Sequence, residues 1–278
     1  MNVMKRLLFF RPVFLLMILS VNAKSQEIFQ PSSRSQAMAD VFVPLNDSWS
    51  VFGNQAGLAE TNQMVLGGSF QNRFLISELA TRTGFVVLPV QSSVFAVSFY
   101  QFGKIPFRQE KIGLAYARKI TPNLNFGFQF NNYRLFLVEE NRSASAVGAE
   151  LGFQYRHNDN LILGLHIYNP YPTKIQLHSE SFKYQSILAL GAFYRLSDTF
   201  SVVCEADHNF DKSVRIKSGF EYSIFEKLFV RAGFSGKPYL FSGGAGFCLG
   251  NLTIDLAASY HQYLGNSPSV SLQYHFSK

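Results

Sequence analysis

Residues 123–133, NLNFGFQFNNY, alternate between apolar and polar side chains. Successive side chains of a β-strand point to opposite faces of the sheet, so this segment is expected to be a strand. One face would carry Leu124, Phe126, Phe128 and Phe130, and the other Asn123, Asn125, Gln129 and Asn131. In a soluble sandwich the phenylalanines would face a protein core. In a membrane barrel they would face lipid, and the amides would line the lumen.

The same alternation recurs along most of the chain and predicts about fourteen strands. Gly, Pro, Asn and Asp gather between the alternating segments, as they do in turns. No run of 18 apolar residues follows Ser25, so no later transmembrane helix is expected. The expected strands lie near residues 63–71, 82–90, 93–102, 108–118, 123–135, 145–156, 160–168, 184–195, 199–207, 213–223, 227–235, 239–248, 252–263 and 269–277.

The connections between these strands fall into two alternating classes. One class is short throughout and comprises residues 91–92, 119–122, 157–159, 196–198, 224–226 and 249–251. The other class includes the longer segments 72–81, 136–144 and 169–183. Short periplasmic turns and longer outer loops are typical of bacterial outer-membrane barrels. The sequence therefore predicts an all-β fold, a transmembrane antiparallel β-barrel of about 14 strands.

The composition agrees with this prediction. Of 278 residues, 29 are phenylalanine and 13 are tyrosine, yet the mean hydropathy is only +0.05, as expected where polar residues alternate with apolar ones. The alternative architecture is a soluble β-sandwich or propeller. Aromatic residues near the ends of the apolar faces, charges in the middle of the polar faces and an export signal all favour the membrane barrel.

Residues 1–25 are expected to be that export signal. Lys5 and Arg6 precede an apolar run over residues 12–21, and small residues stand just before Gln26. The run is shorter than the ~20 apolar residues of a spanning helix, which argues against an uncleaved anchor. Removal of the four basic residues of this segment from the 25 of the whole chain leaves 21 against 18 acidic ones, a net charge of about +3. No basic cluster typical of nucleic-acid binding remains.

Residues 26–62 do not alternate. Ser33 to Glu60 read SRSQAMADVFVPLNDSWSVFGNQAGLAE, and Asp47 or Ser48 is placed to cap a short helix that runs to Leu58.

This stretch resembles the N-terminal region of the FadL/PorV-like outer-membrane barrels of Bacteroidota, which include the PorV- and PorQ-type proteins of type IX secretion. About 28 residues carry the resemblance, and two of them depart from the family pattern, because Gln55 replaces a proline and Ala39 a glycine. The resemblance implies a fourteen-strand barrel of residues 63–278 in the outer membrane of a Gram-negative cell, with residues 26–62 folded into the lumen as a hatch. The matching elements are Ser35, Gln36, Ala37, Met38, Ala39 and Asp40, then Asn46 and Asp47, then the hatch motif Asn54, Gln55, Ala56, Gly57, Leu58 and Ala59.

A group of charged residues falls on the polar face of three successive strands at 199–207, 213–223 and 227–235. Their alternating signs favour an ion-pair lattice that holds the barrel wall. The functional alternative is a polar path, or a docking patch for the hatch or for a ligand. The group, called the lumen charge cluster, consists of Glu205, Asp207, Arg215, Lys217, Glu221 and Arg231.

The sequence predicts no enzyme, cofactor or metal site. Asp255, Ser259 and His261 share one face of a strand, but a serine hydrolase needs a closer and more ordered arrangement, and ordinary lumen-facing polar residues are the preferred interpretation. Cys204 and Cys248 occupy apolar positions of strands, which favours two buried thiols over a disulfide and offers no metal-ligand spacing.

Two functions follow from the resemblance. The first is a component or accessory of type IX protein secretion or surface attachment, with exported proteins or secretion components as partners. The second is a FadL-like channel for the uptake of hydrophobic small molecules, in which the hatch moves to admit a ligand. Both place the chain among outer-membrane lipids, and neither involves nucleic acid.

Overall fold

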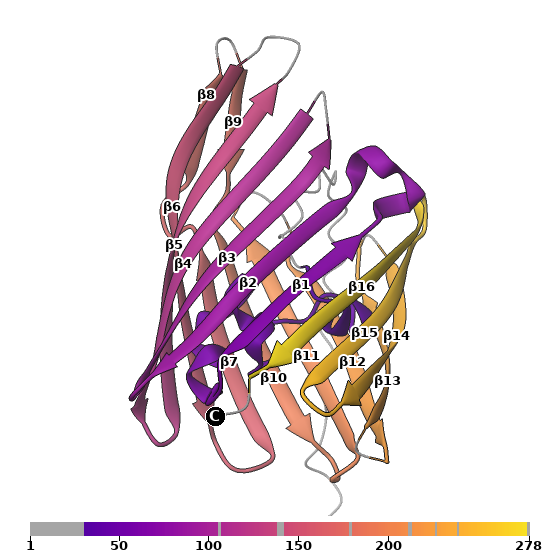
Figure 1. The fold of residues 1–278 in the computed structure, drawn as a ribbon. Helices are drawn as coiled ribbons and strands as arrows, with labels where there is room; N and C mark the ends of the chain where they lie inside the picture. The colour runs from indigo at the N-terminus through magenta and orange to yellow at the C-terminus, as the bar shows by residue number, and fades with distance from the viewer. Residues whose placement is uncertain are drawn as a thin grey trace, which may run out of the picture.

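Fourteen strands close into one antiparallel barrel in the computed structural model, which describes residues 31–104, 107–137, 142–177, 180–210, 213–225, 227–237 and 239–276 (Figure 1). The barrel closes because β1 pairs with both β2 and β16. The predicted fold class is confirmed, and the expected signal segment lies outside the described residues. The barrel strands are β1 (Val65–Gln71), β2 (Thr81–Val90), β3 (Ser93–Lys104), β4 (Phe107–Thr121), β5 (Leu124–Leu137), β6 (Arg142–Arg156), β7 (Leu161–Tyr168), β10 (Ile187–Arg195), β11 (Phe200–Asn209), β12 (Arg215–Ile224), β13 (Leu228–Ser235), β14 (Leu240–Leu249), β15 (Leu252–His261) and β16 (Gly265–His275).

Strand β5 shows how the alternating sequence is used. Gln129 and Asn131 are buried inside the barrel, whereas Phe130 between them is 57 % exposed on the outer wall. Large apolar side chains are exposed on the outer faces of the other strands too. A barrel with phenylalanine side chains outside and amide side chains inside is suited to a lipid bilayer. The lipid chains contact the apolar face, while groups in the lumen form hydrogen bonds with the polar face.

The strands extend further on the side opposite the short turns than the sequence predicts. β5 continues to Leu137 and β6 begins at Arg142, so most of the segment 136–144, expected to be a loop, belongs to these two strands. In β5 the polarity reverses near this end, where Arg134 points outward and Tyr133 and Leu135 point inward. The expectation of a loop was wrong because the strand continues beyond the lipid-facing region. There the alternation is inverted, with apolar residues on the inner face and polar residues on the outer face.

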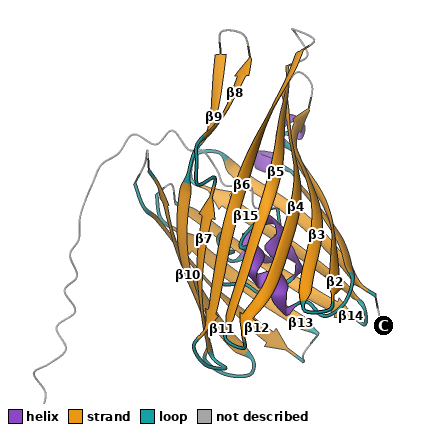
Figure 2. Ribbon diagram, turned by 90° about the vertical axis from the view of Figure 1, so that its left-hand side faces the viewer, coloured by secondary structure: helices purple, strands orange, loops and turns teal. Residues whose placement is uncertain are grey.

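A second sheet rises from the connection between β7 and β10. β8 (Thr173–Leu177) and β9 (Glu180–Tyr184) form a hairpin that projects beyond the barrel at the same end as the tall strands β4–β6 (Figures 1 and 2). The sequence predicted only a long outer loop there. Since six connections at the opposite end are short, we assign the hairpin end to the extracellular side.

Residues 31–62, called the plug, lie inside the barrel (Figure 2). None of the described helices is long and apolar enough to span a membrane. The plug contains α1 (Ser33–Ala37) and two 3₁₀ helices, η1 (Ser48–Phe52) and η2 (Gln55–Glu60). The expected single helix from 47 or 48 to Leu58 was therefore wrong. Gly53 interrupts it, and a Cβ there would lie 2.8 Å from Phe42 Cδ1, so the chain turns close beneath Phe42.

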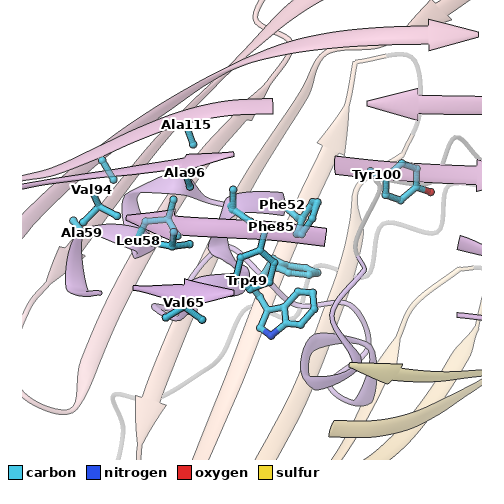
Figure 3. Packing of buried hydrophobic residues seen from close by; sticks show 14 residues of the cluster. Trp49, Phe52, Leu58, Ala59, Val65, Phe85, Val94, Ala96, Tyr100 and Ala115 are labelled. Carbon is cyan, nitrogen blue, oxygen red and sulfur yellow. The ribbon is translucent and has the colours of Figure 1, made fainter. Parts of the chain in front are cut away.

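An apolar cluster joins the plug to the wall formed by β1–β4 (Figure 3). The Trp49 ring lies edge-on to that of Phe85, with 4.8 Å between centroids, and Phe52 also meets Phe85 edge-on at 6.0 Å. Leu58 and Val65 are fully buried in the same cluster. These side chains remove water from one side of the plug, while α1 packs against β13–β16 on the other.

Candidate functional site: the plug and the lumen above it

The hatch motif begins with Asn54, which caps η2 and also ties two segments together. Its Oδ1 accepts a hydrogen bond of 3.2 Å from Ala56 N. Its Nδ2 donates to the carbonyl of Val43 at 2.9 Å and to that of Phe153, in β6, at 3.0 Å. A single asparagine thus binds one plug segment, caps the next helix and fixes both to the wall, with both amide donors and the amide oxygen in use.

The remaining motif residues fill a narrow space between plug and wall. Gln55 Nε2 donates to Glu150 Oε2 at 2.9 Å, and Ala56 and Leu58 are fully buried. At Gly57 a Cβ would lie 2.4 Å from Ser50 Oγ and 2.5 Å from the carbonyl of Leu45. Only glycine fits there, because two other turns of the plug touch the backbone.

The lumen charge cluster has one half centred on Lys217. Its Nζ lies 2.7 Å from Glu205 Oε1 and 2.8 Å from Asp207 Oδ2, and Arg215 also binds Asp207. Lys217 donates to the carbonyl of Asp40 in the plug at 2.9 Å. The other oxygen of Glu205 accepts from the backbone N–H groups of Phe42 and Val43, at 2.7 and 2.8 Å.

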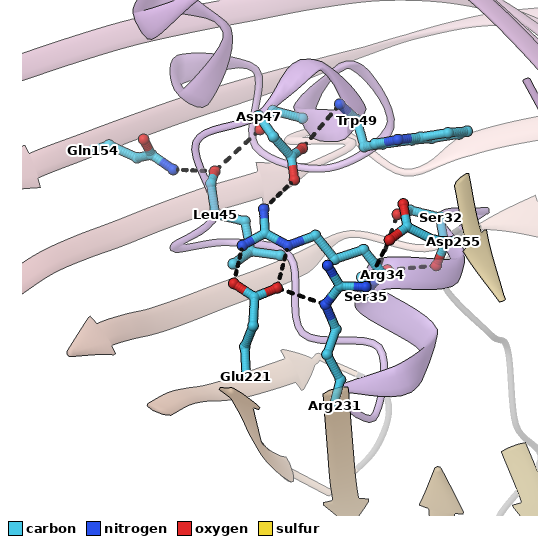
Figure 4. A network of polar contacts seen from close by, with 11 residues as sticks. Ser32, Arg34, Ser35, Leu45, Asp47, Trp49, Gln154, Glu221, Arg231 and Asp255 are labelled. Atoms are coloured by element: carbon cyan, nitrogen blue, oxygen red, sulfur yellow. Dashed lines mark hydrogen bonds and ion pairs between the residues drawn. The ribbon is translucent and has the colours of Figure 1, made fainter. Parts of the chain in front are cut away.

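The other half of the cluster is centred on Glu221 (Figure 4). Arg34 of the plug donates to both of its carboxylate oxygens, at 2.9 and 2.8 Å, and to Asp47 at 2.7 Å. Arg231 bridges Glu221 at 2.5 Å and Asp255 at 2.6 Å. The six residues named from the sequence therefore form two ion-pair groups on the wall, and each group also holds the plug.

A third anchor, which the sequence reasoning missed, is Glu150 in β6. It accepts hydrogen bonds from Lys111 at 3.2 Å and Asn131 at 2.8 Å, besides the bond from Gln55. His166 Nε2 lies 3.2 Å from its second oxygen. In the alternating pattern, Lys111 and Glu150 occupy positions that face the lumen. The pattern therefore predicts that both lie inside the barrel, but it does not predict that they form an ion pair.

The three anchors share one design. In each, a wall carboxylate is paired with a wall cation and also accepts a hydrogen bond from the plug, and these partners offset the cost of burying the carboxylate. The wall pairs are Glu150 with Lys111, Glu205 with Lys217, and Glu221 with Arg231.

Glycines on the inner wall allow the plug backbone to come this close. At Gly152 a Cβ would lie 2.0 Å from Asn54 Oδ1, and at Gly164 it would lie 2.4 Å from the Val43 carbonyl. Such contacts are possible only where the wall lacks side chains. The wall glycines within van der Waals distance of the plug, by this measure, are Gly127, Gly152, Gly164, Gly191, Gly219, Gly233 and Gly244.

The short-turn end of the plug carries a titratable contact at Glu60. Burial alone would raise its pKa, but hydrogen bonds from Lys119 and Asn125 and the charges of Lys119 and Arg156 more than offset this and hold the pKa below its ordinary value of 4.5. Because the folded-state pKa is lowered, the ionised group stabilises the plug fully above pH 4.5 and stops doing so as the pH falls through the folded-state pKa.

We therefore expect protease resistance of the plug to fall in acid in the wild type, and to a smaller extent in a Glu60→Gln variant. At neutral pH the free energy of plug opening should differ between the wild type and Glu60→Gln by about 1 kcal/mol or less, because the contact of Glu60 is half exposed. The measurement is the rate of plug cleavage by one acid-tolerant protease in detergent, above and below pH 4.5. Identical pH profiles for the two proteins would contradict a role for Glu60.

The lumen on the extracellular side of this anchor layer is lined by an apolar cluster, called the upper cluster. The Tyr133 and Tyr184 rings stack with 4.4 Å between centroids, and Tyr168 meets Tyr133 edge-on at 6.5 Å. Neither this cluster nor the hairpin that contributes to it was foreseen, because the residues of the cluster come from five strands. Its buried members are Tyr133, Leu135, Tyr168, Ile175, Tyr184 and Ile187.

Residues considered for other chemistry have ordinary partners. Ser259 accepts from Gln36 of the plug at 2.9 Å, Asp255 binds Arg231, and His261 Nδ1 accepts from backbone N–H groups at the end of β15. Both cysteines are free thiols, but neither is buried as expected, since Cys204 is exposed and Cys248 is partly exposed. The position of Cys204 on the apolar face was right, and that face turns to the outside.

Comparison with solved structures identifies the architecture. No protein-family model and no curated protein matches the sequence. A monoaromatic hydrocarbon channel, CymD, superposes with a TM-score of 0.71 at 13 % identity, covering 91 % of this chain and 100 % of the other. The fold is FadL-like. The Ralstonia pickettii toluene transporter TbuX (TM-score 0.66, 13 % identity, 88 % and 98 % covered) and a Pseudomonas aeruginosa FadL homologue (0.66, 13 %, 89 % and 98 %) share it.

The FadL-like fold bears on the earlier expectations. It is a fold of outer-membrane proteins, and the matched proteins named above are channels, transporters or FadL homologues rather than enzymes. The part of the predicted resemblance that concerns FadL-like barrels is thus supported, whereas the assignment to PorV-type proteins of Bacteroidota gains no support from these matches. At 13 % identity the likeness establishes the fold alone.

Proposed function

We propose that this chain is a non-enzymatic outer-membrane channel for hydrophobic small molecules. The observation that carries the proposal is the upper cluster. A water-filled pore needs a polar lining, but here stacked tyrosines and aliphatic side chains occupy the lumen above the anchor layer. The toluene and monoaromatic hydrocarbon specificities of the fold neighbours support the same class of ligand.

In this proposal the plug is the gate. It contacts β13–β16 through α1 and β4–β6 through η2, so it bridges opposite parts of the wall. The plug makes hydrogen bonds to three wall anchors, while its apolar side chains, Trp49 and Phe52 among them, face β1–β4. A ligand that moved from the upper cluster towards the periplasm would first meet the Glu150 anchor, because Lys111 Nζ lies 5.7 Å from the centroid of the Tyr168 ring, and it would have to displace Gln55 from Glu150.

The role in type IX secretion or surface attachment, the first interpretation of the sequence, gains no support from the matched structures named above. The hatch motif on which it rested has a structural use in this barrel, since Asn54 and Gln55 bind the plug to β6. We therefore retain the uptake of hydrophobic molecules as the function.

The test is a flux assay in liposomes that contain the purified full-length protein. A tritiated monoaromatic hydrocarbon should enter faster than in empty liposomes, and a sugar of similar size should not. Leu135→Asn places an amide in the upper cluster, where Leu135 is fully buried, and should reduce hydrocarbon flux about tenfold, because an unpaired amide in an apolar site costs ~1–3 kcal/mol.

The matched control is Leu75→Asn, the same substitution at an extracellular position that is 63 % exposed. It should leave the flux unchanged. Hydrocarbon entry no faster than in empty liposomes, or equal loss in both variants, would refute the proposal. Heat-modifiable migration on gels verifies that each variant is a folded barrel.

A further inference from the structure

Three arginines point outward from the extracellular ends of neighbouring strands. Arg82 belongs to β2, Arg108 to β4 and Arg134 to β5. Arg82 and Arg134 are exposed, and the Arg108 side chain is 37 % exposed. Towards the short turns, each strand continues with apolar outward residues, so the arginines stand above the lipid-facing surface. Those residues include Val86 and Leu88 in β2, Ile112 and Leu114 in β4, and Phe128 and Phe130 in β5.

Strand pairing brings the three arginines into one array. Arg82 is paired with Gln101, Gln101 with Glu110, and Glu110 with Arg134, so these positions form one row across β2–β5. Arg108 stands one outward position beyond Glu110. With strands ~4.8 Å apart, the array spans ~10–15 Å. This is wide enough for two anionic groups of one lipid molecule.

Aromatic rings fix the guanidinium groups in place. Arg108 and Arg134 both lie over the Phe136 ring, at 4.2 and 5.5 Å from its centroid, and Arg82 lies over Phe70 at 5.7 Å. A cation held over a ring keeps its N–H donors free at the edge of the guanidinium plane. Long basic side chains that merely extend towards water would not need such platforms.

The array has more positive than negative charge. Glu110 is 3.1 Å from Arg108 Nε, but within the described ranges neither Arg82 nor Arg134 has a carboxylate partner. The upper outer surface of β13–β15 differs, because it presents exposed aromatic residues: Phe234, Phe241 and Tyr260. Within the described ranges, the three outward arginines thus gather on the β2–β5 side of the barrel.

We propose that this array, Arg82, Arg108 and Arg134, binds the phosphate groups of the glycolipid in the outer leaflet, the lipid A type. Its height just beyond the apolar surface is the level of lipid head groups. Arginine forms forked, charge-assisted hydrogen bonds with phosphate, and the excess positive charge matches an anionic partner. The inference concerns the outer wall and is independent of what passes through the lumen.

The test uses the purified full-length barrel in detergent and lipid A as the probe. Binding of bisphosphorylated lipid A is measured by native mass spectrometry, beside the same lipid after enzymatic removal of its phosphates. The wild type should bind the phosphorylated form at least tenfold more tightly. Arg108→Gln with Arg134→Gln should lower that affinity about tenfold or more, since one charge-assisted hydrogen bond corresponds to about a decade of affinity.

The control variant is Arg118→Gln with Arg195→Gln, which removes two exposed arginines near the short turns. It should bind lipid A as the wild type does. Heat-modifiable migration shows that all three proteins are folded. Equal binding of phosphorylated and dephosphorylated lipid, or wild-type binding by the Arg108/Arg134 variant, would overturn the proposal. Full competition by inorganic phosphate would also overturn it, because the site would then recognise a soluble anion rather than the lipid.

Discussion

Replacement of Lys217 by methionine should lower the free energy of unfolding by about 3–5 kcal/mol, the usual result when one partner of a buried ion pair is removed. Lys217 is fully buried and lies between Glu205 and Asp207, at 2.7 and 2.8 Å. Its loss would leave the buried Glu205 carboxyl group without its cation, beside the plug backbone that this carboxyl group holds. Asp207 would keep Arg215.

The measurement is the midpoint of the heat-induced shift in gel migration, or of denaturant unfolding in detergent micelles. The double variant Glu205→Gln with Lys217→Met is the control, because it removes both charges and leaves an amide that can still accept from Phe42 and Val43 N–H. It should recover a large part of the lost stability. A change below about 1 kcal/mol in Lys217→Met would mean that water reaches the pair.

Gly127→Val should open the plug rather than unfold the barrel. A Cβ at Gly127 would lie 2.4 Å from Gln55 C and 2.5 Å from Ala56 N, and both are backbone atoms that cannot swing aside. η2 would have to leave the wall, at a cost of about 1–3 kcal/mol for an overpacked site. The population of open plug, and with it the rate of plug proteolysis, should rise roughly tenfold.

The control for this variant is Gly243→Val in β14, where the nearest atom to an added Cβ is the Arg231 carbonyl at 3.6 Å. It makes the same substitution in a barrel strand without touching the plug. Proteolysis and single-channel conductance in planar bilayers should both increase in Gly127→Val and stay at the wild-type level in Gly243→Val. Equal behaviour of the two variants would show that the glycines matter to the strands and not to the plug.

Much of the barrel could be predicted because its signal is local. Alternation along β5 requires only that neighbouring side chains face opposite ways, and short turns on one side fix the strand order. The lumen charge cluster could also be foreseen as a neighbourhood, since Glu205 with Lys217 and Glu221 with Arg231 lie on strands joined by short connections and face each other in register. Pairing between consecutive strands needs no knowledge of the rest of the fold.

The plug contacts could not be foreseen in the same way. Arg34 reaches Glu221, and Gln55 reaches Glu150, across 187 and 95 residues of sequence. The prediction of one helix from Asp47 onward was wrong at its end. Asp47 does cap a helix, but that helix ends at Gly53, where the backbone packs closely against Phe42. The β8–β9 hairpin was missed because its strands are short and carry no lipid-facing face to produce the strong alternation of the barrel.

By itself the sequence determined the outer wall of this protein, its strand number and its division into lipid-facing and lumen-facing sides, because each of these follows from a period of two along the chain. Only the tertiary structure decided how the plug is held in the lumen and what lies above it. The three carboxylate anchors, the glycines beneath the plug and the stacked tyrosines above it depend on the closure of β1 onto β16, which brings distant segments within a few ångströms of each other.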